Sequence, residues 1–275
     1  MNKLPNERKV QVVNALCNGM SLRAASRVLG IHRTTIMNLL VRVGERCDGL
    51  VADHMRDLDC RRLELDELWT FCGKKEGRLT AEEKLNDELG DQYLFFAIDH
   101  NTKLVPAWSL GKRDHVTALQ LLYQLRRSLN GTRPQLSSDA WGGYHETIGA
   151  LFGDSVDWAT LTKEYEGTSA GRGRYAPPRV SGIIKRVELG RPNEDEICTS
   201  IIERKNLTVR TMQRRFTRLT VAFSRKWANL RAACALHFGY YNFVWQHRSL
   251  DGITPAMAAG VTPNLWSVAD LVGDC

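Results

Sequence analysis

Three acidic residues, Asp66, Asp139 and Glu203, occupy positions where a carboxylate needs a specific reason. Asp66 lies among apolar residues in a predicted strand, Asp139 ends a second short strand, and Glu203 begins a predicted helix. A buried carboxylate is costly unless it is paired, hydrogen-bonded or bound to a metal ion. Two Asp and one Glu brought together from two strands and a helix would form an all-oxygen site, which suits Mg²⁺ or Mn²⁺ better than zinc.

The chemistry of such a site is displacement at a phosphodiester. Two divalent ions roughly 4 Å apart can activate a nucleophile and stabilise the leaving oxygen, as a nuclease or strand transferase requires. Position alone leaves the assignment open, because an isolated acid is more often a turn or cap residue. Glu67 and Asp99 are alternatives to Asp66, and Glu188 is an alternative to Glu203.

Two regions of the chain are strongly basic. Residues 204–231 contain nine Arg or Lys and no Asp or Glu, and residues 1–50 contain eight basic against three acidic residues. The 275-residue chain carries a net charge of only +7, so the distribution says more than the sum. Two separate basic regions favour a nucleic-acid partner, although a basic helix can also be a solvated face.

Residues 1–47 predict an all-α unit of three helices. Apolar residues recur at helical spacing from Val10 to Met20. Ser21 is placed to cap a second helix, and Gly30 ends it. A third helix is predicted from Arg33, with an inner side formed by Ile36, Leu39, Leu40 and Val43.

This order of helices is typical of a helix-turn-helix, although other three-helix bundles share it. In the motif, the second helix lies in the major groove of DNA and its first residues contact base edges. The candidates for that contact are His32, Arg33, Thr34, Thr35 and Asn38.

The remainder of the chain predicts an α/β or α+β unit with a mixed sheet, over residues 63–275. Strands are expected in 62–71, 92–111, 134–138 and 156–165, and long helices in 200–247. Asp114 should cap a helix whose inner side is formed by Val116, Leu119, Leu122, Leu125 and Leu129. Residues 48–62 are expected to be a linker or connecting helix.

Two further segments carry no assigned chemistry. Residues 72–91 are expected to be a solvated insertion. The loop 167–182 contains three Arg and could either contact a nucleic-acid backbone or be a plain flexible loop.

The seven cysteines argue against a metal-binding ribbon and a disulfide framework. Their number is odd and none forms a C-x-x-C pair, so reduced thiols in a cytosol are the simplest interpretation. The chain has no run of 18 apolar residues and no apolar signal core near Met1, so neither a membrane partner nor secretion is expected.

Several motifs together resemble the DDE transposases of the insertion-sequence-one type. The most specific is TSIIERKNLTVRTMQRRFTRLTVAFSRK, which begins at Thr199. The others are ELDELW at 64–69, SDAWGGY at 138–144, RYAPPRV at 174–180 and YYNFVWQHRSLDGITPAMAAGVTP at 240–263. The resemblance covers most of residues 60–270 and implies a ribonuclease-H-like core.

The resemblance implies roles for individual residues. Asp66, Asp139 and Glu203 match the catalytic acids that hold the divalent metal, Mg²⁺ or Mn²⁺, with two ions expected. Arg210 lies seven residues after Glu203 and hence on the same side of a helix, where it would contact DNA phosphates. The residues of this helix region expected to contact DNA are Arg204, Lys205, Asn206, Arg210, Arg214, Arg215 and Arg218.

The function implied is that of a transposase. It would bind the terminal inverted repeats of an element, cut double-stranded DNA there and join the ends to target DNA, as a homodimer or larger assembly in the nucleoid of a prokaryotic cytoplasm. One alternative is an inactive or domesticated helix-turn-helix regulator, against which the three acids argue. Another is a stand-alone ribonuclease-H-type nuclease, against which the DNA-reading N-terminus argues.

Overall fold

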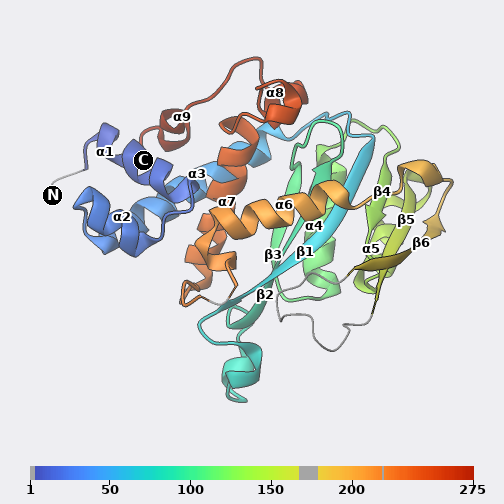
Figure 1. Cartoon of the computed structure of the whole chain (residues 1–275), viewed down its shortest axis with the longest axis horizontal. Helices are drawn as coiled ribbons and strands as arrows, with labels where there is room; N and C mark the ends of the chain where they lie inside the picture. Colours follow the sequence, from blue (N-terminus) through green and yellow to red (C-terminus); the bar gives the residue numbers. More distant parts are fainter. Residues whose placement is uncertain (1–3, 167–178, 219) are drawn as a thin grey trace.

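The computed structural model describes residues 4–166, 179–218 and 220–275, and its centre is a mixed six-stranded sheet (Figure 1). The strand order is β3-β2-β1-β4-β5-β6, in which β4 runs parallel to β1 and to β5 and the other neighbours are antiparallel. The strands are β1 (Arg62–Cys72), β2 (Gly90–Asp99), β3 (Ala107–Gly111), β4 (Gln135–Ser138), β5 (Asp157–Tyr165) and β6 (Val180–Leu189). The prediction of an α/β fold with a mixed sheet is confirmed.

Helices cover both faces of this sheet (Figure 1). Side chains alternate along β2, so Leu94 and Phe96 are buried in one apolar core while Phe95 and Ala97 are buried in another. The first core is completed by α6 (Ser200–Met212) and α7 (Trp227–Phe243), and the second by α4 (His115–Ser128) and α5 (Gly143–Phe152).

The N-terminal helices share the first of these cores. They are α1 (Asn6–Cys17), α2 (Leu22–Leu29) and α3 (Arg33–His54), and α3 lies along α7 (Figure 1). A Cβ at Gly44 of α3 would lie 2.3 Å from the carbonyl oxygen of Ala232 in α7. The close approach of the two helices therefore depends on a glycine at this position.

The local predictions for these helices agree well with the structure. The Ser21 side chain caps α2 by accepting a hydrogen bond of 3.1 Å from the Ala24 N–H, and Gly30 follows in the left-handed conformation with φ of 63°. All four residues predicted on the inner side of α3 are buried. The helix continues to His54, so residues 48–54 of the predicted linker are helical.

The predicted inner face of α4 is partly wrong. Asp114 caps the helix as expected, by accepting a hydrogen bond of 2.9 Å from the Thr117 N–H. However, Val116 and Leu119 are 50% and 40% exposed, and the buried stripe is Ala118, Leu121, Leu122 and Leu125. The prediction followed the larger apolar residues and ignored a small alanine, which allows the helix to pack closely on the sheet.

Two features of the chain are added by the structure. β6, which the sequence analysis did not predict, is an edge strand paired with β5. The predicted insertion at 72–91 contains two short 3₁₀ helices, Glu76–Arg78 and Glu83–Leu85. The other 3₁₀ helices are Gly153–Ser155, Glu194–Glu196, Arg214–Phe216 and Arg248–Leu250.

The C-terminal segment returns to the N-terminal helices. It contains α8 (Pro255–Ala258) and α9 (Val268–Val272), and α9 packs against α1 and α3 (Figure 1). Within the described residues, none of the helices combines the length and apolarity needed to cross a bilayer.

Candidate functional site

The three predicted acids line one cleft. Asp66 lies in the middle of β1, Asp139 directly follows β4, and Glu203 lies in the first turn of α6. β4 pairs in parallel with β1, with Glu64 opposite Ser137. The two aspartates, each two residues further on, therefore lie at the same level of the sheet on neighbouring strands. The cleft has a volume of about 490 Å³, and all three acids contribute to its lining.

Asp66 is the most perturbed of the three acids. Burial raises its pKa to about 6, and the charges of Asp139 and Glu203 act in the same direction. Two hydrogen bonds oppose this rise: one of 2.8 Å from the Glu67 N–H and one of 2.6 Å from the Asn206 amide. A carboxylate strained in this way by burial and like charge would be relieved by a cation.

Glu67 belongs to the same acidic group. Among the described residues, Asp66, Glu67 and Asp139 are the acids whose oxygens lie within 4.8 Å of one another. Burial raises the pKa of Glu67 to about 7, and the neighbouring Asp139 and Asp66 add to the rise. The sequence offered Glu67 as an alternative to Asp66. In the structure Glu67 lies close to Asp66 and Asp139 but is not among the residues that line the cleft.

Glu203 lies in the cleft but is held by other groups. It forms an ion pair with Lys163 of β5, with 2.5 Å between Nζ and Oε2, and accepts a hydrogen bond of 2.9 Å from the Thr199 hydroxyl. Its carboxylate is therefore partly neutralised by Lys163. A metal ion that bound Glu203 would have to compete with this lysine.

The next turns of α6 face the same acids. The Asn206 amide donates to Asp66, while its Oδ1 is buried and accepts no hydrogen bond from the described residues. Burial lowers the pKa of Arg210, and the charge of Asp66 opposes that change, so the two groups are close enough to interact. Glu203, Asn206 and Arg210 thus form one side of α6, at the spacing of helical turns.

The start of α6 is fixed to β1 by Glu64, a residue that the sequence analysis did not single out. Its buried carboxylate accepts two hydrogen bonds of 2.9 Å, from the backbone N–H groups of Ile201 and Ile202, and a third of 2.7 Å involves Nδ1 of His100. An anionic acceptor at a helix N-terminus satisfies free N–H groups and interacts well with the helix dipole.

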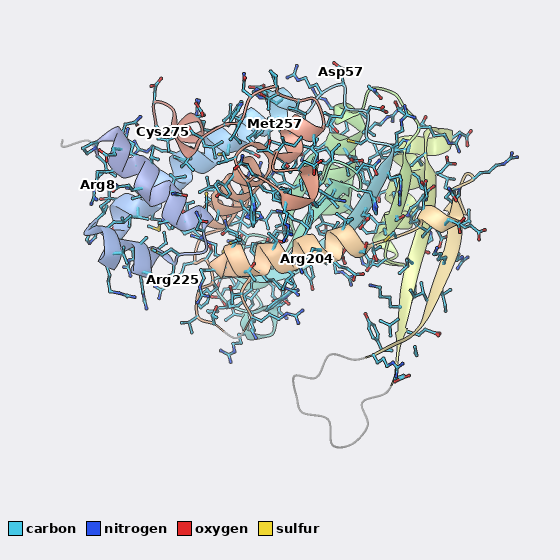
Figure 2. The ribbon with its side chains drawn as sticks, turned by 45° about the horizontal axis from the view of Figure 1, so that its top comes forward. Arg8, Asp57, Arg204, Arg225, Met257 and Cys275 are labelled. Carbon is cyan, nitrogen blue, oxygen red and sulfur yellow. The ribbon has the colours of Figure 1, made fainter. Side chains whose placement is uncertain are left out.

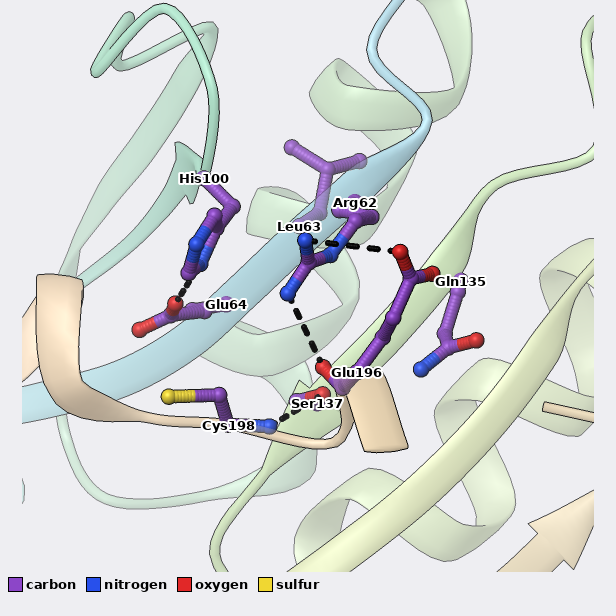
Figure 3. Close-up of a pocket in the computed structure, with 8 residues that line it drawn as sticks. All are labelled: Arg62, Leu63, Glu64, His100, Gln135, Ser137, Glu196 and Cys198. Atoms are coloured by element: carbon purple, nitrogen blue, oxygen red, sulfur yellow. Dashed lines mark hydrogen bonds and ion pairs between the residues drawn. The ribbon is translucent and has the colours of Figure 1, made fainter. Parts of the chain in front are cut away.

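Neighbouring contacts strengthen this connection (Figure 3). Arg62 forms an ion pair of 3.5 Å with Glu196, and the Cys198 N–H donates to the Ser137 hydroxyl at 3.4 Å. Residues of β1 and β4 that lie just before the two aspartates therefore hold the segment that leads into Glu203. Only the fold could reveal this arrangement, because the partners lie far apart in sequence.

The basic residues predicted to contact DNA divide by exposure. Arg204 and Arg218 are exposed, and Arg210, Arg214 and Arg215 are half-buried. Lys205 is only 3% exposed, with Nζ 3.0 Å from Nε2 of His237 and over the ring of Tyr241. The predicted DNA contact is therefore corrected for Lys205, because its side chain points into the core between α6 and α7. Figure 2 shows Arg204 on the outer side of α6.

The five residues predicted to read base edges lie at the start of α3. His32 caps α3, and it and the other four are all exposed. Two of the alternative acids lie elsewhere: Asp99 accepts hydrogen bonds within its own turn from Thr102, and Glu188 accepts one from the Thr160 hydroxyl. Most of the loop 167–182 lies outside the described residues.

Comparisons with known proteins give limited information. No family model matches the chain, and no curated protein matches it. Among solved structures, similarity is found to a pre-cleavage Mos1 transpososome, with 13% identity and a TM-score of 0.24 over 57% of this chain and 60% of that one. A Mos1 mariner paired-end complex with Mn has 16% identity and a TM-score of 0.23, over 55% of this chain and 59% of that one.

The chain thus spans about 60% of the length of these two Mos1 chains. Similarity at this level does not establish function. The function must therefore be argued from the residues in the cleft.

Proposed function

We propose that the protein is a metal-dependent DNA transposase of the DDE type with a ribonuclease-H-like core. The observation that carries the proposal is the meeting of Asp66, Asp139 and Glu203 in one cleft, beside the basic helix α6. The resemblance of their flanking motifs to insertion-sequence-one transposases supports the same reading.

The residues of the cleft fit Mg²⁺ or Mn²⁺. The three acids offer only oxygen donors, and the pKa of Asp66 is raised by burial and like charge. The buried Oδ1 of Asn206 lacks a partner among the described residues. Asp66, Asp139 and Glu203 would hold the metal, with two ions expected from the family resemblance. When bound, such ions activate the attacking oxygen and stabilise the leaving oxygen.

The protein's own side chains position the reactants. Asn206 keeps Asp66 oriented, and Glu64 fixes the helix that carries Glu203. Exposed Arg204 and Arg218 would contact the phosphate backbone, with Arg210, Arg214 and Arg215 nearby. The start of α3 would recognise the terminal inverted repeats.

The reaction has two steps, with no covalent protein–DNA intermediate. Water attacks a phosphodiester at the end of the element and releases a 3′-hydroxyl. That hydroxyl then attacks a phosphodiester of the target, so one bond forms as another breaks. Joining two ends requires at least two copies of the protein on DNA.

The test is strand cleavage of a duplex that carries the element's own end. We expect nicking in Mg²⁺, none in EDTA, and loss of nicking in Asp139→Ala and Glu203→Ala. Asp154→Ala is a matched control, because that acid is exposed and lies outside the cleft. Cleavage that survived both substitutions would show that the wrong carboxylates have been assigned.

One observation favours a second candidate, a DNA-binding regulator without cleavage activity. The ion pair between Lys163 and Glu203 neutralises the third acid. A regulator would bind the same duplex tightly and leave it intact in Mg²⁺ and in Mn²⁺, whereas a transposase would cut it.

A further inference from the structure

Arg113 is a cationic residue of the acid cleft that the proposed mechanism does not yet use. It lies in the loop between β3 and α4 and lines the cleft together with Asp66 and Asp139. Its nearest approach to Asp139 is 3.9 Å, between Nη2 and Oδ2. At this distance the guanidinium does not form a close ion pair with Asp139, so its N–H groups can still bind a ligand.

The other side of Arg113 is firmly anchored. Nε donates a hydrogen bond of 2.7 Å to Oε1 of Glu67, and Nη2 forms an ion pair of 2.5 Å with the same oxygen. The guanidinium carbon lies 5.1 Å from the centroid of the Trp141 ring and 5.9 Å from that of Tyr93. An arginine held by a carboxylate and by aromatic rings keeps its planar donors in a defined direction.

The exposed fractions of Arg113 and Glu67 show which of the two can contact a ligand. The Glu67 side chain is 4% exposed, whereas that of Arg113 is 40% exposed and reaches the cleft. A carboxylate this deeply buried needs a cation, and Arg113 supplies it. The buried acid is therefore the support and the arginine is the group presented to a ligand.

The contacts of Glu67 also argue against a role as metal ligand. Oε1 is occupied by Arg113, and Oε2 lies 3.4 Å from the hydroxyl of Tyr144. Adjacent residues of a strand point to opposite faces, so Glu67 faces the α4 and α5 side while Asp66 faces α6. One oxygen of Glu67 nevertheless lies within 4.8 Å of oxygens of Asp66 and Asp139, so the experiment below includes a test of metal binding.

We propose that Arg113 contacts the phosphate at which the strand is cut, and that Glu67 positions it. The inference rests on the proposed function, because the ligand is the scissile phosphodiester of that reaction. Arg113 would donate two parallel hydrogen bonds to phosphate oxygens and stabilise the charge that develops on them. Glu67 would act only through Arg113.

The test measures single-turnover cleavage of the element-end duplex by the full chain. We expect Arg113→Ala to lower the rate about a hundredfold, Arg113→Lys to recover part of it, and Glu67→Gln to lower it about tenfold. The double variant should equal Arg113→Ala, because residues that act as one unit are not additive. Arg127→Ala is the control, since Arg127 is exposed on α4 outside the cleft.

A Mn²⁺ titration distinguishes positioning from metal binding. The Mn²⁺ concentration that gives half the maximal rate should be the same in the wild-type protein, Glu67→Gln and Arg113→Lys. A tenfold increase in Glu67→Gln alone would make Glu67 a ligand and overturn the inference, as would an Arg113→Ala variant that cuts normally. Thermal melting identifies any variant that fails to fold. If Arg113→Ala does not fold, the cleavage rate of Arg113→Lys tests the role of Arg113 instead.

Failure of the proposed function gives a different result. If the wild-type protein binds the duplex but never cuts it, the transposase proposal fails. Arg113 is then tested by the salt dependence of duplex binding. The slope of the logarithm of the binding constant against the logarithm of the salt concentration should decrease in Arg113→Ala by the amount expected for about one phosphate contact. An unchanged dependence would overturn the phosphate contact as well.

Discussion

The start of α3 and the acid cleft are two candidate sites built in opposite ways. At α3, five exposed side chains come from one continuous segment, His32 to Asn38, and helix periodicity alone places them on the surface. In the cleft, Asp66 and Glu203 are 137 residues apart, and they meet only because α6 crosses the sheet beside β1 and β4. A site within one element depends little on the rest of the fold, whereas an assembled site depends on all its supports.

The two sites are nevertheless joined by the packing of α3 on α7. Because the sites lie on different elements, a change in the cleft should leave DNA binding at α3 intact. A change in the packing of α3 on α7 should affect both sites. The predictions below test this contrast, beginning with the largest expected effect.

Asp66→Asn should abolish metal-dependent cleavage while DNA binding is retained. Loss of one metal-holding carboxylate should cost about 4 kcal/mol of transition-state stabilisation, or about a thousandfold in rate. Cleavage and fluorescence anisotropy on the same duplex measure the two properties. An equal loss of binding would mean that the two sites are not separable.

Stability should fall as the pH rises through the range in which Asp66 and Glu67 ionise. The pKa is raised to about 6 for Asp66 and to about 7 for Glu67, so the folded state holds protons that the unfolded state has released. Their contribution is fully present below about pH 4 and is lost as the pH rises through about 6 for Asp66 and about 7 for Glu67. It is on the order of 3 kcal/mol for Asp66. Urea unfolding at several pH values should show a smaller loss in Asp66→Asn, and Mg²⁺ should reduce it in the wild type.

Gly44→Ala should damage the joint between α3 and α7. The new Cβ would meet the backbone of Ala232, which cannot move aside as a flexible side chain would. Overpacking of this kind costs about 2 kcal/mol. Gly49→Ala is a matched control on the same helix, because a Cβ there meets nothing within 4 Å. Equal stability of the two variants in urea would contradict the packing argument.

Glu64→Gln should loosen the start of α6. The variant keeps the shape but loses the charge that accepts hydrogen bonds from Ile201, Ile202 and His100, at a cost of about 1.5 kcal/mol. Cleavage should fall with little change in duplex binding. Amide hydrogen exchange should show faster exchange in the first turn of α6, and protection equal to the wild type would count against this role.

Arg33→Ala should have the smallest effect and the opposite pattern. If the start of α3 reads bases, losing one contact should weaken binding to the element end about tenfold, and the melting temperature should stay the same. Binding to an unrelated duplex should change little. An Arg33 variant that binds both duplexes normally would remove the base-reading role from this residue.

The sequence alone was informative wherever the determinants are local. The Ser21 cap, the end of α2 at Gly30, the inner side of α3 and the Asp114 cap were all read correctly from spacing and capping chemistry. The positions of β1, β4 and β5 followed from alternation and turn residues. These features depend on the period of a helix or strand, which one segment displays by itself.

Other features were decided only by tertiary structure, because they depend on what lies opposite a residue. Lys205 is part of a basic run in sequence, but the fold turns it toward His237 and Tyr241. Glu64, Arg113 and Lys163 gained their roles from partners on other elements. Sequence therefore determined most of the elements and named the three acids, while the packing of α6 across the sheet decided which groups surround them.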